Sequence, residues 1–198
     1  MRKVMLSAVL AIPLLASATT TNLITNGDFE TYGPSFSGFS TVNSGSSALT
    51  GWTVGGISVD VINSSYGAIM GNSIDMLGTP GPGTLSQTFA TAVGQTYLLN
   101  FDLAANETTG DSKALTVDFG STEGNFVGTG AVTPQSLTFT ANSALSTLYF
   151  ASAASGYSGA VIDNVVVSAV PEPETYAMLL AGLGLVGAAV KRRKIKQG

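Results

Sequence analysis

The segment YLLNFDL, residues 97–103, alternates its side chains with a period of two. Tyr97, Leu99, Phe101 and Leu103 all fall on one face, because successive residues of a β-strand point to opposite sides of the sheet. A helix would instead repeat its apolar residues every three or four positions. The segment therefore predicts a strand that has one face in a hydrophobic core.

The same period recurs along most of the chain, in ISVDVI (57–62), ALTVDF (114–119), SLTFT (136–140), TLYFA (147–151) and AVIDNVVV (160–167). Gly, Ser, Asn and Pro separate these segments, and no long amphipathic helix interrupts them. The pattern predicts an all-β fold, an antiparallel β-sandwich with a jelly roll as its preferred form. We expect a long loop over residues 31–50 and a rigid turn over residues 78–84.

Composition narrows the function classes. The 198 residues include no Cys and no His, which excludes a Ser-His triad, a Cys nucleophile and a His-bound zinc. Residues 19–170 carry ten acidic residues and only one basic residue, Lys113, a formal charge of −9 that disfavours nucleic acid. We therefore expect no enzyme activity and no nucleic-acid partner.

A paired-carboxylate hydrolase is the one catalytic alternative left. Asp60, Asp75, Asp102 and Asp118 lie on or beside the predicted strands. Alternating strands place such acids on the solvent face by default, so this alternative ranks last.

The N-terminus, MRKVMLSAVLAIPLLASA, has the three parts of a signal peptide. Arg2 and Lys3 supply the positive region, residues 4–15 the apolar region, and residues 16–18 the small-residue cleavage site. We expect cleavage after Ala18, so that residues 1–18 form a signal helix and the protein is exported.

The C-terminus reads VPEPETYAMLLAGLGLVGAAVKRRK, residues 170–194. Its uncharged part, residues 176–190, would span about 22 Å as a helix, short for a bilayer core of about 30 Å. A basic tail follows over residues 191–196, with its cluster at Lys191, Arg192, Arg193 and Lys194. By the positive-inside rule we expect a short transmembrane helix that stops transfer at the inner membrane.

The order of Pro171, Glu172 and Pro173, a glycine-interrupted apolar run and a basic cluster closely resembles the PEP-CTERM sorting signal. The resemblance implies recognition by an exosortase-type membrane protease or transpeptidase. It further implies transient residence in the inner membrane, then delivery to the cell surface or medium of a Gram-negative, exopolysaccharide-producing bacterium. The chain then divides into a signal peptide (1–18), a sandwich domain (19–169) and a sorting signal (170–194).

The domain carries a second resemblance. NLITNGDFE (22–30), read as the first strand, NSIDMLGTPGPGTLSQTF (72–89), GQTYLLNFDLAAN (94–106) and GAVIDNVVV (159–167) look like the choice-of-anchor C family, in family order. That family resembles galactose-binding-like jelly rolls, the architecture of many carbohydrate-binding modules. The resemblance implies contact with a glycan, either exopolysaccharide or cell-wall polysaccharide.

Jelly rolls of this kind often hold a structural Ca²⁺ between their first and last strands. The resemblance then implies Glu30 and Asp163 as ligands, with Asp28 third, because Ca²⁺ takes six to eight hard oxygen ligands. The alternative is that residues 26–28 form only a turn and Asp163 is an ordinary acid at a strand end.

Glycan-binding surfaces use exposed aromatic rings with a few polar partners. Trp52, Tyr66 and Tyr157 are the candidates, the two tyrosines because they lie in Ser/Gly loops. Packing in the core or at its rim is the alternative for Trp52. We therefore expect a non-catalytic glycan-binding module, with a purely structural matrix or adhesion protein as the alternative.

Overall fold

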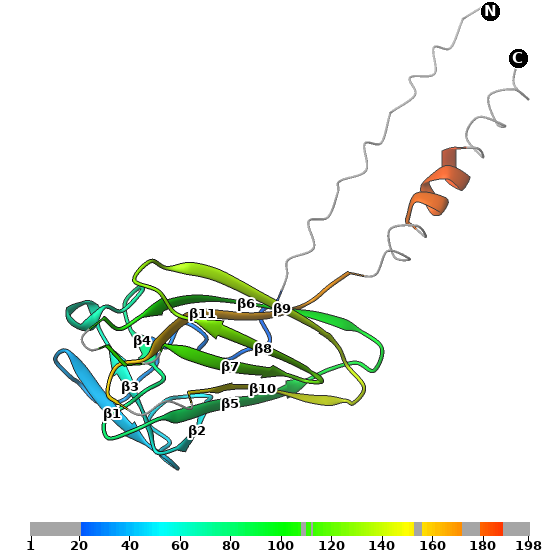
Figure 1. The fold of residues 1–198 in the computed structure, drawn as a ribbon. Helices are drawn as coiled ribbons and strands as arrows, with labels where there is room; N and C mark the ends of the chain where they lie inside the picture. The colour runs from blue at the N-terminus through cyan, green and yellow to red at the C-terminus, as the bar shows by residue number, and fades with distance from the viewer. Residues whose placement is uncertain (1–20, 108–109, 112, 153–155, 172–178, 188–198) are drawn as a thin grey trace, which may run out of the picture.

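A computed structural model describes residues 21–107, 110–111, 113–152, 156–171 and 179–187. Two antiparallel sheets lie face to face, as Figure 1 shows, so the predicted β-sandwich is confirmed. The expected signal helix lies outside the described residues.

One sheet has six strands, in the order β1 (Phe39–Asn43), β3 (Ser58–Ile62), β4 (Ser73–Asp75), β11 (Ala160–Ala169), β6 (Thr96–Ala105) and β9 (Thr133–Thr140). The other has five, in the order β2 (Thr53–Gly56), β5 (Gly83–Ala90), β10 (Leu145–Ala151), β7 (Ala114–Phe119) and β8 (Thr122–Val127). From β4 to β7, and again from β8 to β11, each connection crosses from one sheet to the other, as in a jelly roll.

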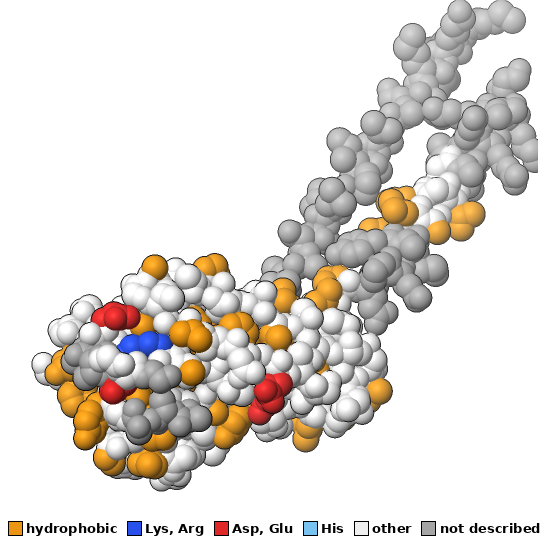
Figure 2. Space-filling view, in the orientation of Figure 1, with side chains coloured by type: hydrophobic (Ala, Val, Ile, Leu, Met, Phe, Trp, Pro, Cys, Tyr) orange, Lys and Arg blue, Asp and Glu red, His pale blue; other side chains and the backbone are white. Residues whose placement is uncertain are grey.

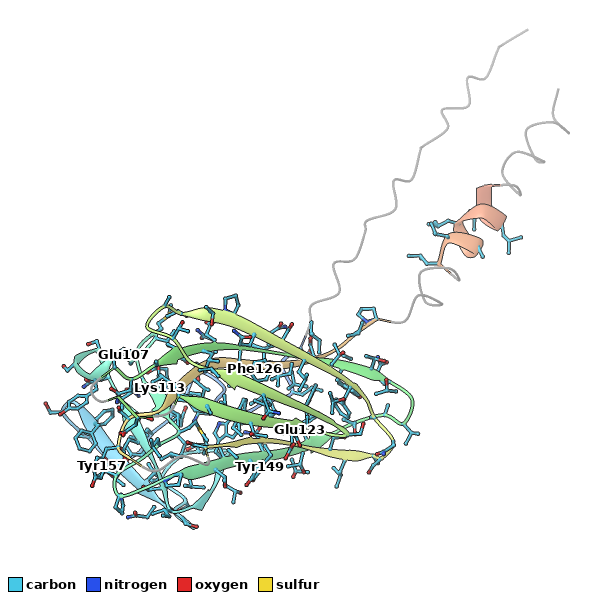
Figure 3. The ribbon with its side chains drawn as sticks, in the orientation of Figure 1. Glu107, Lys113, Glu123, Phe126, Tyr149 and Tyr157 are labelled. Atoms are coloured by element: carbon cyan, nitrogen blue, oxygen red, sulfur yellow. The ribbon has the colours of Figure 1, made fainter. Side chains whose placement is uncertain are left out.

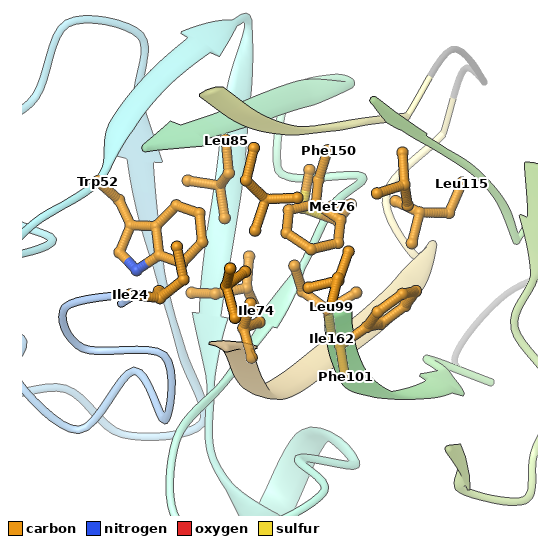
Figure 4. Close-up of a cluster of buried hydrophobic side chains, with 14 of the residues drawn as sticks. Ile24, Trp52, Ile74, Met76, Leu85, Leu99, Phe101, Leu115, Phe150 and Ile162 are labelled. Carbon is orange, nitrogen blue, oxygen red and sulfur yellow. The ribbon is translucent and has the colours of Figure 1, made fainter. Parts of the chain in front are cut away.

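The core fills the space between the sheets. Tyr97, Leu99, Phe101 and Leu103 of β6 are all buried there, as the alternation predicts. Phe101 meets Phe150 of β10 edge to face, with 5.4 Å between ring centroids, a favoured aromatic geometry. Figure 4 shows side chains of both sheets interlocking in this layer.

The segment NLITNGDFE does not form the strand that we expected. Residues 24–28 form bends and turns, and isolated hydrogen bonds join the segment to β11. In one of them Leu23 N–H donates to Val167 O (2.8 Å). Gly27 packs so closely on β11 that a Cβ there would lie 2.0 Å from Val165 O. The contact falls in an irregular stretch of β11, whose pairing with β6 shifts register between Asp163 and Val166.

The expected long loop over residues 31–50 contains a strand. β1 pairs with β3 from Phe39 opposite Ile62 to Asn43 opposite Ser58. Only Val42 of this strand is fully buried, so its hydrophobic pattern is too weak to predict it.

Loops cover the outer face of the six-stranded sheet at β3 and β4, and here the prediction of solvent-facing acids is wrong. Every residue of β3 and β4 is buried, which places Asp60 and Asp75 out of solvent. Asp102 and Asp118 are half-buried. Alternation identifies the face that avoids the core, but it does not reveal whether loops cover that face.

Residues 179–187 form a helix whose large apolar side chains, Leu179, Leu180, Leu183, Leu185 and Val186, are exposed. Among the described residues, no helix is long and apolar enough to cross a membrane. The predicted span over residues 176–190 lies partly outside those residues, so it stays a prediction.

Candidate functional site

A cavity of about 160 Å³ opens where the loops cover the outer face of the six-stranded sheet. Three aromatic side chains line it, those of Phe39, Tyr66 and Tyr157. The remaining lining residues are Asp60, Ile62, Thr79 and Asn106. We call this the aromatic cavity. It brings together two of the three predicted glycan-binding residues, from sequence positions far apart.

Phe39 and Tyr66 form a pair on one side of the cavity, with ring centroids 5.1 Å apart. Tyr66 ends a 3₁₀ turn, η1 (Ser64–Tyr66), which Asn63 caps by accepting a hydrogen bond from Ser65 N–H (3.0 Å). Gly38 lies beneath the ring with φ +82°, and a Cβ there would come within 2.6 Å of it. Only glycine suits both the backbone and the contact.

Tyr157 is 61% exposed, on a loop before β11. Its N–H donates to the Asp111 carboxylate (2.8 Å), and the neighbouring Ser158 carbonyl accepts from Lys113 Nζ (2.9 Å). The Lys113 ammonium also donates to the carbonyl of Asn106. Lys113 thus joins the two loops that supply Tyr157 and Asn106, a structural role for the domain's single lysine. Figure 3 shows Glu107, Lys113 and Tyr157 at the same end of the sandwich.

Asp60 gives the cavity a carboxylate, although only 4% of the residue is exposed. Thr79 donates to it from its N–H (3.2 Å) and its hydroxyl (3.1 Å). Burial raises the pKa of Asp60, and the bonds from Thr79 and from Thr41 on β1 oppose that rise.

Asp75 lies beside Asp60 on the next strand and is completely buried. Its Oδ1 accepts from Leu77 N–H and Gly159 N–H, both at 2.9 Å, and its Oδ2 from the Asn106 amide (2.8 Å). Burial raises its pKa from 3.8 to about 6 despite these bonds. The side chain anchors loops that surround the aromatic cavity.

A wider hollow of about 500 Å³ adjoins the aromatic cavity and shares Tyr66 and Asn106 with it. Its lining includes Glu107, Ile69 and Val132. We call it the side hollow.

The prediction that Trp52 binds glycan is wrong, because its side chain is 4% exposed. Its ring packs on Phe29 (5.4 Å between centroids) and Phe150 (6.2 Å), and its indole N–H donates to Asn26 O (2.9 Å). Figure 4 shows it at the edge of the core beside Ile24. The alternative, packing, is the role that the structure gives it.

The three predicted calcium ligands line one hollow of about 190 Å³, formed by Asp28, Glu30, Met70, Asp163 and Asn164. Burial raises the pKa of Asp163 to about 6, and the charge of Glu30 contributes to the rise. The two carboxylates already accept protein donors, Glu30 from Asn72 N–H (2.8 Å) and Asp163 from the Ser73 hydroxyl (2.9 Å). No group of three or more acidic side chains in the described residues is arranged to hold a metal ion. Calcium therefore stays a proposal.

The sorting motif begins where the sandwich ends. Val170 N–H donates to Thr96 O (2.8 Å), and the Gln95 amide donates to Val170 O (2.6 Å). Pro171 follows at once and is exposed, while Glu172, Pro173 and the basic cluster 191–194 lie outside the described residues.

Sequence reasoning missed Phe39, Asp60 and Asn106 as lining residues of the cavity. Phe39 belonged to an expected loop, Asp60 to a strand face taken as solvent-exposed, and Asn106 to the end of a strand. Their convergence depends on how the loops fold, which no spacing in the sequence reveals.

Two family models match the chain. A model described as "Protein of unknown function (DUF642)" matches residues 22–168, and the PEP-CTERM protein-sorting motif matches residues 169–194. The first covers the segments that resemble the choice-of-anchor C family, and the second confirms the predicted sorting signal. That motif marks a protein exported for sorting to the cell surface. Among curated proteins, none matches the chain.

The chain is also similar to solved carbohydrate-binding modules. With a CBM4 module it shares 16% identity over 74% of this chain and 99% of that chain, at a TM-score of 0.48. With a CBM61 module in complex with β-1,4-galactotriose it shares 19% sequence identity, over 76% of this chain and 100% of that chain, at a TM-score of 0.46. An exo-β-1,3-galactanase from Phanerochaete chrysosporium shares 16% sequence identity, over 67% of this chain and 30% of that chain, at a TM-score of 0.42. At such identities the likeness concerns fold alone, so function must be argued from this chain's own surface.

The raised pKa of Asp75 predicts that stability falls as pH rises. Between pH 3.8 and about 6 the folded state holds a proton that the unfolded state has lost. The contribution of this proton to the free energy of unfolding is complete below pH 3.8 and is lost as pH rises through about 6. The melting temperature should be higher at about pH 5 than at about pH 7.5, and Asp75→Asn should flatten this slope. An unchanged slope in the variant would contradict the assignment.

If Ca²⁺ occupies the Asp28–Glu30–Asp163 hollow, EDTA should lower the melting temperature and added Ca²⁺ should restore it. A ligand at a hundred times its Kd stabilises by about 2.7 kcal/mol. Asp163→Asn should melt at one temperature in both buffers, whereas Asp118→Asn on the other sheet should keep the wild-type difference. If EDTA leaves the melting temperature of the wild-type protein unchanged, the proposed calcium site is contradicted.

Proposed function

This chain belongs to the family described as DUF642, and from its sorting motif and its surface we propose that it is an exported, non-catalytic glycan-binding protein. The polysaccharide would be exopolysaccharide or cell-wall glycan. The aromatic cavity and the side hollow would hold it.

The observation that supports this proposal is the convergence of three aromatic rings on one cavity with polar groups between them. Sugar rings carry apolar faces that stack on aromatic side chains, and hydroxyl groups that need hydrogen-bond partners. Tyr66, 38% exposed, and Tyr157 offer such faces. Asp60 and Thr79 add polar groups to the same cavity.

Processing follows from the tail. An exosortase-type enzyme would cut near Pro171–Pro173, after the apolar tail had held the precursor transiently in the inner membrane. The motif starts directly after Val170, whose backbone is bonded to β6 and the turn before it. The cut would therefore leave the folded sandwich intact.

A purely structural matrix or adhesion protein is the second candidate. A neutral, Ser/Thr-rich edge strand such as β9 would suit it, because this strand presents few groups for a specific ligand. It predicts no aromatic site, so the built cavity favours glycan binding.

Catalysis has weaker support. Asp60 and Asp75 are adjacent, yet Asp75 has no exposed surface and its carboxylate oxygens accept three protein hydrogen bonds. A hydrolase needs both carboxyl groups to reach the glycosidic bond. The carboxylate-hydrolase alternative therefore remains the least supported proposal.

Tyr157→Ala and Tyr66→Ala should abolish retention of the protein on a polysaccharide column, because each removes a stacking face. A nucleobase stacked on an aromatic ring contributes on the order of 1–3 kcal/mol. On the same scale for a sugar face, each change should weaken binding by roughly tenfold or more. Tyr149→Ala, a half-buried tyrosine on β10, is the matched control and should be retained. Equal retention of all three variants would show that glycan binds outside the aromatic cavity, and no retention of the unaltered protein would favour the structural alternative.

Intact mass of the native protein from membrane, surface and medium fractions tests the processing proposal. The surface and medium forms should begin near Thr19 and end near Pro171–Pro173. A single form that still ends at Gly198 in every fraction would show that the tail is retained and would contradict cleavage.

A further inference from the structure

The aromatic cavity contains a negative charge that no cation of the described chain neutralises. Asp60 accepts hydrogen bonds from Thr79 and Thr41, both neutral donors. Lys113 is the one Lys or Arg in residues 21–107, 110–111, 113–152, 156–171 and 179–187. Its ammonium is held by the Asn106 and Ser158 carbonyls. Asp60 is only 4% exposed, and its carboxylate therefore faces the cavity without an ion partner among the described residues.

The cavity walls add a second attraction for positive charge. The faces of Phe39, Tyr66 and Tyr157 carry the negative side of the aromatic quadrupole. A cation over such faces is stabilised, and more strongly where water is displaced. The Asp60 carboxylate can accept a hydrogen bond from the hydroxyl of a neutral sugar, but an ammonium group adds a charge attraction to that bond. An acidic sugar would be repelled by Asp60.

Size favours a small group or one ring. The cavity of about 160 Å³ lies below the roughly 300–1,000 Å³ of pockets that enclose a drug-sized ligand. The side hollow continues the site past Tyr66 and Asn106 and brings Glu107, an exposed second carboxylate, to the path of a longer chain. Figure 2 shows a single blue side chain on this face, with acidic side chains on two sides of it.

We propose that the aromatic cavity binds the protonated amino group of an amino-sugar residue in a polysaccharide, with Asp60 as its ion partner and the three rings as its walls. This assignment rests on the proposed glycan-binding function and specifies its ligand class. Glu107 would meet the amino group of a neighbouring residue in the chain.

Calorimetry on the full chain in detergent micelles tests the assignment with three short oligosaccharides of equal length. One consists of glucosamine with free amines, one of N-acetylglucosamine and one of glucose. The free-amine form should bind about tenfold or more tightly than the other two, as expected when a cation–π contact and an ion pair act together.

The variants identify the source of this preference. Asp60→Asn should abolish the preference for the free amine, while Asp118→Asn, the same change on β7, should retain it. If Asp60→Asn fails to fold, Tyr157→Leu should reduce free-amine binding about tenfold, with Tyr149→Leu as its control.

Three outcomes would overturn the assignment. Equal binding of all three oligosaccharides, unaffected by Asp60→Asn, would refute the ammonium site while leaving glycan binding intact. Failure of every oligosaccharide and of polysaccharide retention would refute the proposed function itself. Tighter binding of free choline than of the glucosamine oligomer would keep the ammonium chemistry but exclude the amino sugar.

Discussion

A buried carboxylate, that of Asp75, ties together the loops at the end of the sandwich that contains the aromatic cavity. A carboxylate without solvent contact must have its oxygens satisfied by protein donors, or its burial costs several kcal/mol. Asp75 obtains its three donors from Leu77, Gly159 and Asn106, which belong to three different parts of the chain. The loops that carry Thr79 and Tyr157, and Asn106 itself, are thus fixed over one face of the sheet.

The other properties of the site depend on these loops, which cover the outer face of β3 and β4. Because loops exclude water from the outer face of β3 and β4, Asp60 has a raised pKa and opens onto a cavity instead of bulk solvent. Lys113 binds the same two loops from the outside. Because the described residues contain no other Lys or Arg, the cavity keeps an unbalanced negative charge, and this charge is the basis of the amino-sugar ligand that we propose.

Much of the fold could be predicted from the sequence, because burial of one face forces a period of two. Leu115, Val117 and Phe119 face the core as their spacing indicated, and the sorting signal was readable because its order of Pro171, charge and apolar run is itself the signal. The site was only partly predictable. Tyr66 and Tyr157 stood out as aromatic residues in polar loops, whereas Trp52, for which packing was the alternative, lies in the core. Phe39 and Asp60 join the site through long-range loop packing, which local patterns do not encode.

The most direct test of the account is an NMR titration of the isotope-labelled protein with glucosamine oligosaccharide. The account predicts that the largest shift changes occur at the backbone and side chains of Phe39, Tyr66, Asn106 and Tyr157, with Trp52 unmoved. Changes centred instead on the outer strands of the five-stranded sheet, or none at saturating ligand, would contradict the claim that the aromatic cavity is the binding site.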